Sequence, residues 1–541
     1  MKSKIILKSS SIFTSDSDKP FAGYVVIEGN KIAKVAEGDD YEQYVTDDTQ
    51  VIDCGDKTVS PGFIDSHTHF FMGVLSSSDL MNTDLIESTS AEHCIEMMKE
   101  FERQHPDYDR LLGMGWYISF WNDAPLPSKE SLDEAFPDKP VYLVNADAHT
   151  TWMNTKAIEE AGYAGNTDYD NENILRDENG ELTGIFKEAE SIDIQSYKLP
   201  MISNEIFLKI IKETCEHANS LGLTSMSEMN GYYFNDFSEN LYGMAQTLEK
   251  EGDMTVRLHI YPELAADKSN EKALELKKRI NSEVVRISGL KGFLDGVAAT
   301  YTALLIDPYT DRPDTCGIDV PKVTVEELED YVLRTNKSGL SVRVHAIGDG
   351  AVRMALDAFE KSKKAGYSDG VVNVIEHIEE ILPEDIPRFK ELGVMGCMQP
   401  AHLLLDYIEK PIRVGNRAKL MWAHRTLLDA GMELAFSTDF PIIPLGPYRD
   451  LYVAVTRKTE DGQDTGTNQE EQKITLGEAL TAYTKTSAKA VGRDDIGVIR
   501  EGMLADIVVS DRDLFACDPD DLIKAGAYMT IMDGRIVYQS E

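Results

Sequence analysis

Short apolar runs alternate with amphipathic stretches along the second part of the chain. Amphipathic segments such as 351–364 and 383–392 have apolar residues at helical spacing and predict helices. The apolar runs between such segments are rich in valine, isoleucine and leucine, which predicts buried strands. These strands cover residues 223–227, 255–260, 284–287, 340–344, 371–375, 394–398 and 433–437.

One more apolar run, at residues 63–66, follows Pro61-Gly62 and predicts a strand near the start of the chain. With this run the chain holds eight strands separated by helical segments, which is the pattern of a (β/α)₈ barrel. The predicted fold class is therefore α/β, with a TIM-like (β/α)₈ barrel as the main domain. An irregular stretch from about 70 to 220 predicts a large insertion, with its own sheet, after the first barrel strand.

Both ends of the chain carry short strands with tight-turn signals. Gly29-Asn30 lies between two strand-like runs, and Asp533-Gly534 does so near the C-terminus. Neither end has enough strands to bury a sheet face alone, so we expect the two ends to pair into one small β-sandwich domain. The predicted domains are 1–58 (first part of the β-sandwich), 59–475 (the barrel with its insertion) and 476–541 (the end of the last barrel helix and second part of the β-sandwich).

The charge of the chain argues against several classes of partner. With 54 basic and 94 acidic residues, the 541-residue chain has a formal net charge of −40 at pH 7. A field of this sign opposes binding to nucleic-acid phosphates and anionic membranes, so we expect a small-molecule substrate, no nucleic acid and no membrane partner. The six cysteines are scattered without a Cys-x-x-Cys pair, which favours reduced thiols over disulfides.

The sequence also indicates a cellular compartment. No run approaches the ~20 consecutive apolar residues that a transmembrane helix needs. The N-terminal run Ile5-Ile6-Leu7 is too short for the core of a signal peptide. These features together predict a cytoplasmic protein.

Residues with metal-binding side chains stand at the ends of the predicted strands. His67 and His69 follow the first strand, and alternate residues of a strand face the same side, so both imidazoles can reach one metal ion. His345, His377 and Asp439 end three later strands, at the barrel edge where active sites form. A lone strand-end histidine usually packs as an ordinary hydrogen-bonded residue. Packing does not explain the joint placement of four.

Five segments together resemble the amidohydrolase superfamily, and more closely its YtcJ-like group of metal-dependent hydrolases. The resemblance spans nearly the whole chain and includes Gly115-Trp116 and residues 149–154 of the insertion. No single segment is specific, but the set is. The five segments are 61–69, 345–351, 375–377, 399–402 and 437–441.

The resemblance implies a divalent metal, usually zinc, held by His67, His69, His345, His377 and Asp439. Imidazole and carboxylate ligands suit zinc, and a position left for water would let the metal lower the pKa of that water toward neutrality. Asp439 is the expected general base, which takes the proton of the water and passes it to the leaving group. Its alternative role is to cap the following helix.

Lys291 decides between one metal and two. It resembles the lysine that is carbamylated in many members of the superfamily, where the carbamate becomes an anionic oxygen ligand that bridges two metals. The alternative is an ordinary lysine paired with Asp295 or another carboxylate. One metal would then be held by the His-x-His pair, His345 and Asp439, and His377 would orient the substrate in catalysis.

Other residues are expected to contact the substrate. His149, Gln399 and His402 would hold or polarise it, and Trp116 would form an apolar wall, although hydrogen-bonded or packing roles are the alternative for each. Glu188 matches a family segment, yet a solvated or capping carboxylate is the simpler interpretation.

The predicted function is that of a metal-dependent amidohydrolase that cleaves a non-peptide carbon–nitrogen bond, of amide or N-acyl type, by metal-activated water. One alternative is a deaminase on the same scaffold, which attacks an amidine-type carbon. Another is a non-catalytic barrel, which the occupied metal positions oppose. The resemblance to the family also leads us to expect a homodimer.

Overall fold

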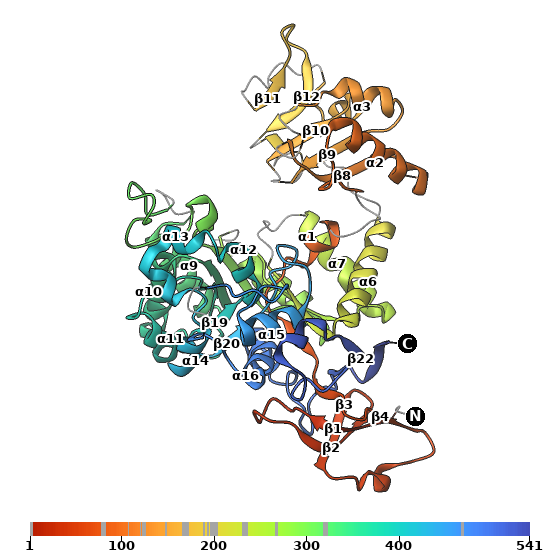
Figure 1. Ribbon diagram of the computed structural model, residues 1–541, viewed down its shortest axis with the longest axis vertical. Helices are drawn as coiled ribbons and strands as arrows, with labels where there is room; N and C mark the ends of the chain where they lie inside the picture. The colour runs from red at the N-terminus through yellow and green to blue at the C-terminus, as the bar shows by residue number, and fades with distance from the viewer. Residues whose placement is uncertain are drawn as a thin grey trace. The chain divides into compact units, whose positions relative to one another are not determined.

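The computed structural model describes the chain in two compact units. One comprises Met1–Gly73 and Ile211–Glu541, and the other comprises Val74–Ile210. Figure 1 labels their helices and strands. The described residues are 4–76, 83–106, 108–118, 121, 126–146, 149–164, 173–187, 190–191, 194, 204–229, 236–265, 269–317, 323–466 and 470–540.

Strands from both ends of the chain pair into one eight-stranded sheet of the larger unit. Its order is β23-β22-β21-β5-β1-β2-β3, with β4 paired to β1. The Asp-Gly turn joins β22 to β23: Gly534 has a φ of 72°, and a Cβ there would collide with the Gly29 carbonyl oxygen. The strands are β1 (Lys4–Ile12), β2 (Phe21–Glu28), β3 (Lys31–Glu37), β4 (Thr49–Asp53), β5 (Thr58–Pro61), β21 (Ile507–Ser510), β22 (Ala527–Met532) and β23 (Arg535–Gln539).

Both faces of this sheet carry buried apolar side chains, and successive residues of each strand point to opposite faces. Ile5 and Leu7 of β1 pack with Val509 of β21, whereas Ile6 packs on the opposite face with Tyr24. β5 runs almost directly into β6 (Phe63–Asp65), since only Gly62 separates them. The sheet therefore anchors the strand that leads to the histidine pair.

Nine short parallel strands among the described residues form two further sheets of the same unit. Their orders are β15-β14-β13-β6 and β16-β17-β18-β19-β20. The predicted strand 284–287 corresponds to β15, which pairs with β14; beyond a division at Ser288 the chain continues as β16, which pairs with β17. The predicted α/β class is confirmed. Besides β6, the strands are β13 (Leu223–Glu228), β14 (Arg257–Ile260), β15 (Val285–Ile287), β16 (Gly289–Phe293), β17 (Ser341–Ala346), β18 (Val374–His377), β19 (Met395–Met398) and β20 (Leu434–Phe436).

Backbone hydrogen bonds join the two parallel sheets at two places. At one junction the Asp439 amide, just after β20, donates to the His67 carbonyl oxygen at 2.9 Å. At the other, the Lys291 amide of β16 donates to the Pro262 carbonyl oxygen at 2.8 Å. Three residues with candidate metal-binding side chains therefore have their backbones fixed at these junctions.

Helices follow the parallel strands along the chain, as parallel connections require. The α9 helix begins with a capping box between Thr324 and Glu327, and α11 ends at Gly393, whose φ is 72°. The helices of this unit include α1 (Phe70–Ser76), α6 (Asn204–Ser220), α7 (Asp236–Glu251), α8 (Glu271–Arg279), α9 (Val325–Lys337), α10 (Asp349–Lys364), α11 (Ile386–Leu392), α12 (Leu403–Asp406), α13 (Lys410–Val414), α14 (His424–Asp429), α15 (Pro447–Thr456), α16 (Leu476–Thr481) and α17 (Ser487–Ala490).

The unit Val74–Ile210 has a sheet of its own, in the order β11-β12-β10-β9-β8-β7. The β7, β8 and β9 strands are parallel, whereas β9, β10, β12 and β11 pair antiparallel. Trp116, Trp121 and Trp152 pack in its apolar core. Its elements are β7 (Thr83–Asp84), α2 (Ala91–Gln104), β8 (Leu111–Trp116), α3 (Lys129–Ala135), β9 (Val141–Asn145), β10 (Thr150–Met153), α4 (Thr155–Glu160), β11 (Ile174–Arg176) and β12 (Leu182–Lys187).

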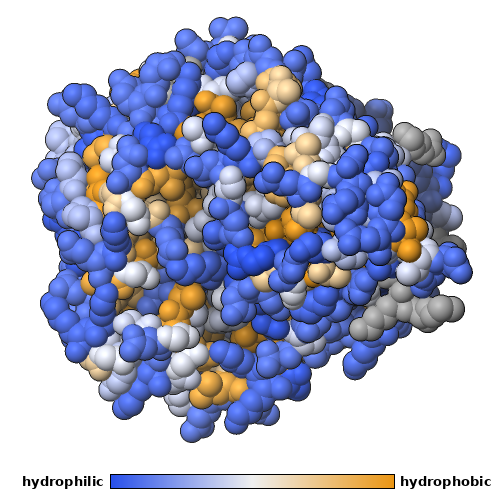
Figure 2. Space-filling model, turned by 90° about the horizontal axis from the view of Figure 1, so that it is seen from below, coloured by the Kyte–Doolittle hydropathy of each residue, from blue (hydrophilic) through white to orange (hydrophobic). Residues whose placement is uncertain are grey.

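The face of the molecule in Figure 2 is mainly hydrophilic, with apolar side chains gathered in small separate patches. Such a surface agrees with a charged content of 27%. Among the described residues, no helix combines the length and the apolar character that a membrane crossing demands.

Candidate metal centre

The histidine pair after β6 converges on one carboxylate. His67 Nε2 and His69 Nε2 lie 3.2 Å and 3.4 Å from the same atom, Oδ1 of Asp439. That oxygen is buried yet makes no hydrogen bond in proper geometry. Burial alone would raise the pKa of Asp439, but His67, His69 and His377 hold it well below its usual range. The three donor atoms therefore surround a point that a cation can occupy.

His345 and His377 extend the cluster from the ends of β17 and β18. Their ring centroids are 4.3 Å apart, and that of His377 is 5.0 Å from the His67 ring. Burial lowers the pKa of His345 to about 3 and that of His377 well below its usual range. The His345 Nε2 donates to the Gly296 carbonyl oxygen at 3.3 Å, which leaves Nδ1 as the lone-pair atom. Both imidazoles are thus neutral, the form that binds metals.

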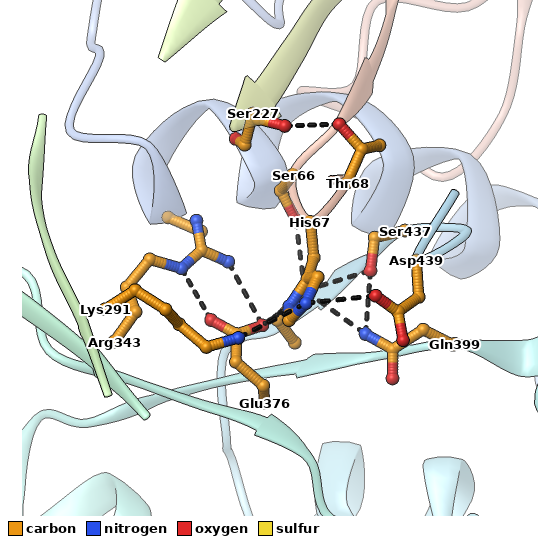
Figure 3. A network of polar contacts seen from close by, with 12 residues as sticks. Ser66, His67, Thr68, Ser227, Lys291, Arg343, Glu376, Gln399, Ser437 and Asp439 are labelled. Carbon is orange, nitrogen blue, oxygen red and sulfur yellow. Dashed lines mark hydrogen bonds and ion pairs between the residues drawn. The ribbon is translucent and has the colours of Figure 1, made fainter. Parts of the chain in front are cut away.

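Lys291 enters the same cluster from β16. Its side chain is fully buried, and its Nζ lies 3.3 Å from His67 Nε2 and 4.6 Å from the centroid of the Phe293 ring. Burial lowers the pKa of this amine to about 8. Figure 3 shows Lys291 and Arg343 reaching toward His67 and Glu376. The neutral form of Lys291 is therefore populated more readily than that of an ordinary lysine, next to the histidine pair.

The candidate ligand atoms have the properties that a metal site needs. Four buried polar atoms around the cluster have no hydrogen-bond partner within the described part of the chain: Asp439 Oδ1, His377 Nδ1, His402 Nε2 and Gln399 Oε1. Orphaned polar atoms at this density are rare in folded proteins and point to an ion, water or substrate that completes them. Imidazole nitrogens with a carboxylate oxygen are ligands that zinc and related divalent metals prefer. The residues present therefore fit a divalent metal.

A buried pair that the sequence did not reveal orients His67. Glu376 Oε2 accepts a hydrogen bond from His67 Nδ1 at 2.7 Å, and Arg343 Nε donates to Glu376 Oε1 at 2.5 Å. Burial would raise the pKa of Glu376, but Arg343 and His67 hold it well below its usual range. The carboxylate keeps the proton of His67 on Nδ1 and leaves Nε2 free for a metal. The signal that could have identified Glu376 in the sequence is a charged residue that continues an apolar run, and that run forms a fully buried strand.

Replacing Glu376 by glutamine should lower metal affinity by about 10–100-fold, because an amide does not fix the tautomer of His67 as a carboxylate does. Competition with a chromogenic chelator measures this directly. Glu384→Gln, which removes the same charge from an exposed pair with Arg353, is the matched control and should leave metal affinity unchanged. Unaltered affinity in the Glu376 variant would show that His67 needs no orienting carboxylate.

A second buried network, made of charged side chains that include His402, lies beside the metal-binding cluster. His402 Nε2 is 3.8 Å from Asp439 Oδ2, and its Nδ1 is 3.6 Å from Glu379 Oε1. Lys410 pairs with Glu379, and its Nζ is 2.9 Å from Oε1 of Glu380. Burial would lower the pKa of His402, but Glu379 and Asp439 raise it. The network therefore places an imidazole that can donate a hydrogen bond at the edge of the candidate site.

In this network the ammonium of Lys410 lies beside the carboxyl groups of Glu379 and Glu380, and the pKa values of these two groups differ. Burial would raise the pKa of Glu379, but Lys410 and His402 hold it at about 2, whereas burial raises the pKa of Glu380 to about 8. Neither Glu380 oxygen has a hydrogen-bond donor in proper geometry, although Lys410 is close. Glu380 is therefore the protonated member of the pair near neutral pH.

This difference predicts a pH-dependent stability. Because the pKa of Glu380 is higher in the folded chain than in the unfolded chain, its protonation favours folding fully below about pH 4.3, and that gain is lost as the pH rises through about 8. Urea unfolding from pH 5 to 8 should show wild type losing stability relative to Glu380→Gln. Parallel stability curves for the two proteins would contradict the assignment.

Of the residues predicted to contact the substrate, Gln399 has an atom available for a ligand, whereas Trp116 does not. Gln399 Nε2 donates to Ser437 Oγ at 2.8 Å, so its unpartnered Oε1 is available to a ligand beside Asp439. Trp116 is fully buried in the core of the smaller unit, and its Nε1 donates to the Leu143 carbonyl oxygen. Its surface is therefore used in packing, and it is left out of the proposed site.

The other two predicted residues also belong to the smaller unit. His149 is exposed just before β10. Glu188 lies outside the described residues.

Comparison with known proteins identifies the family of the chain. The model of the amidohydrolase family matches residues 50–538. The putative amidohydrolase YtcJ of Bacillus subtilis (strain 168) is 30% identical over 503 residues, 92% of each chain. The N-substituted formamide deformylase of Arthrobacter pascens is 24% identical over 542 residues, 99% of this chain and 98% of that protein.

A solved structure supports the same relationship. The crystal structure of an uncharacterized metal-dependent hydrolase from Pyrococcus horikoshii OT3 has a TM-score of 0.79 and 28% identity, covering 96% of this chain and 99% of that one. The family match covers far more than half of the chain, and the similar chains are aligned over nearly their full lengths. The protein is therefore a member of the amidohydrolase family, the family of metal-dependent hydrolases that the five sequence segments indicated.

Proposed function

We propose that this protein is a metal-dependent amidohydrolase that cleaves a non-peptide carbon–nitrogen bond in a small amide or N-acyl compound. The observation that carries the proposal is the convergence of His67, His69 and His377 on the carboxylate of Asp439, with buried lone pairs that no donor among the described residues satisfies. The name of the Arthrobacter relative, which acts on N-substituted formamides, supports a small N-acyl group as the target.

The framework of this site is proposed to be one (β/α)₈ barrel over residues 59–475. The two parallel sheets supply its strands, with β15 and β16 counted as one, and the hydrogen bonds at Asp439 and Lys291 support closure. All the candidate ligands then lie at the carboxyl ends of strands, where barrel enzymes carry their chemistry.

The residues of the chain have distinct roles in the proposed reaction. A bound divalent metal, proposed to be zinc, supplies Lewis acidity that lowers the pKa of water toward neutrality. His67, His69, His345, His377 and Asp439 would hold it. Asp439 takes the proton of the attacking water and returns it to the leaving amine. His402 Nε2 donates to the carbonyl oxygen of the substrate, and Gln399 Oε1 accepts its amide N–H, which satisfies two orphaned atoms.

Lys291 is proposed to be carbamylated and to support a second metal. The neutral amine attacks carbon dioxide, a nitrogen–carbon bond forms, and one proton is released, which yields an anionic oxygen ligand. Its burial, its lowered pKa and its distance of 3.3 Å from His67 Nε2 favour this chemistry. Growth with ¹³C-bicarbonate followed by ¹³C NMR should show a protein carbamate that Lys291→Met lacks. No such signal, with one metal per chain, would leave the single-metal arrangement.

Turnover of a panel of compounds tests the proposed reaction. Metal-loaded protein should hydrolyse N-formyl or N-acyl amines, or lactams, with release of the free amine. Ammonia release from amidine-type compounds alone would instead identify a deaminase. No turnover of any compound above the rate of the Asp439→Asn variant would contradict the proposal.

A further inference from the structure

A charged cavity lies beside the amino ends of β16 and β17. It has a volume of 360 Å³ and is lined by the start of β17 at Ser341, the end of β15 with Ser288, and the segments around α8 and α17. Ser341 precedes His345 by four residues of an extended strand, so roughly 13 Å of strand separates this cavity from the metal centre. The cavity is therefore distinct from the catalytic site.

Positive charge dominates the cavity wall. Its lining includes Lys277, Arg286, Lys489 and Arg493, against a single carboxylate, Asp494. The chain as a whole carries 94 acidic and 54 basic residues. A cavity with four cations is therefore contrary to the overall charge, and general surface composition does not account for it.

Two of these cations form no direct ion pair among the described residues, although the nearby carboxylates Asp495 and Glu283 act on Arg286 in the direction that raises its pKa. Arg286 directs Nε and Nη2 to the Ser282 carbonyl oxygen at 3.1 Å and 2.9 Å, and Lys277 Nζ lies 3.4 Å from the Gly339 carbonyl oxygen. Burial lowers the pKa of Lys277, and Arg286 lowers it further. Partly buried cations that repel each other are unfavourable unless an anion joins them.

The other two cations of the lining are already paired. Arg493 binds Asp495 through Nε at 2.6 Å and through Nη2 at 2.9 Å, and Lys489 pairs with Glu433. The unbalanced charge is therefore concentrated on Arg286 and Lys277. The hydroxyl of Ser341 accepts the Val372 amide at 3.0 Å, which leaves its own proton for a ligand.

We propose that this cavity binds a small, multiply charged oxyanion of the phosphate type. The guanidinium of Arg286 matches two oxygens of such a group, Lys277 supplies a point charge, and the hydroxyl of Ser341 donates to a remaining oxygen. The volume suits a single phosphate or pyrophosphate group, and the net charge of −40 opposes the approach of a polynucleotide. The site is independent of the reaction at the metal centre, and its occupant would stabilise the fold by binding the native state only.

Calorimetric titration of the full chain with orthophosphate, pyrophosphate and phenyl phosphate tests the proposal, with ionic strength held constant by chloride. We expect binding and a higher melting temperature, and we expect Lys277→Met with Arg286→Met to weaken binding by about tenfold or more. The matched control is Arg312→Met with Lys364→Met, which removes the same charge from exposed ion pairs and should leave affinity unchanged.

Two further variants distinguish anion binding in this cavity from a loss of folding and from binding at the metal centre. Arg286→Lys keeps the charge but loses the forked geometry, so it should weaken binding even if the double variant does not fold. Asp439→Asn should bind the anions as wild type does, because it alters only the metal centre. Preference for phenyl phosphate over orthophosphate would identify an esterified phosphate as the ligand. No binding by wild type, or equal affinity in wild type and Arg286→Lys, would overturn the proposal.

Discussion

Replacing Asp439 by asparagine is expected to lower kcat by about 10²–10⁴-fold, the usual contribution of a general base. Asparagine keeps the volume of the side chain but cannot accept the proton of the attacking water. His67, His69 and His377 hold the pKa of Asp439 well below its usual range, so the carboxylate is in its basic form at every working pH. Steady-state kinetics on the best compound of the panel, with metal content determined in parallel, gives the result.

The control for this experiment is another buried aspartate outside the donor set. Asp349 accepts the Ile306 amide at 2.8 Å at the start of α10, and Asp349→Asn should leave kcat within a few-fold of wild type. Turnover near that of wild type in Asp439→Asn with full metal content would assign proton transfer to another group. Loss of metal together with activity would show that Asp439 acts as a ligand first.

Replacing Lys410 by methionine is expected to reduce the free energy of unfolding by about 3–5 kcal/mol, since it leaves a buried carboxylate uncompensated. Lys410 is fully buried, pairs with Glu379 and Glu380, and lies 4.4 Å from the centroid of the Trp422 ring. Urea unfolding at pH 7 measures the change. Most of the stability should return when both glutamates are also replaced by glutamine, because neutral groups of similar shape need no counter-charge.

An exposed lysine supplies the comparison for Lys410. Lys364 pairs with Glu360 one helical turn away on the surface, and Lys364→Met should change stability by less than about 0.5 kcal/mol. Equal effects at Lys364 and Lys410 would show that the buried network does not stabilise the fold. The network also supports His402, so loss of affinity for substrate should accompany loss of stability.

Much of the parallel framework was predictable because its strands are buried on both faces. The predicted run 223–227 corresponds to β13 (Leu223–Glu228), and 394–398 to β19 (Met395–Met398). Continuous apolar runs of this kind are local signals. The division at Ser288 was not predictable, since it depends on which neighbours β15 and β16 find in space.

The candidate histidine and aspartate ligands were predictable for the same reason, because each stands at or just after the end of an apolar run. The groups that support them were not. Lys410 is 31 residues from Glu379 in the chain, and its helix carries no pattern that predicts burial of an ammonium. Trp116 shows the converse limit: an aromatic residue beside a glycine in an irregular stretch fits a pocket wall and a core equally well until its neighbours are known.

Metal content measured together with activity tests the central claim most directly. The purified protein should contain one or two equivalents of zinc or another divalent metal per chain. Removal by a chelator should abolish hydrolysis of the N-acyl substrate, and return of the metal should restore it, with no recovery in a His67→Ala, His69→Ala variant. A metal-free protein that hydrolysed the substrate at the rate of the loaded protein would contradict the account.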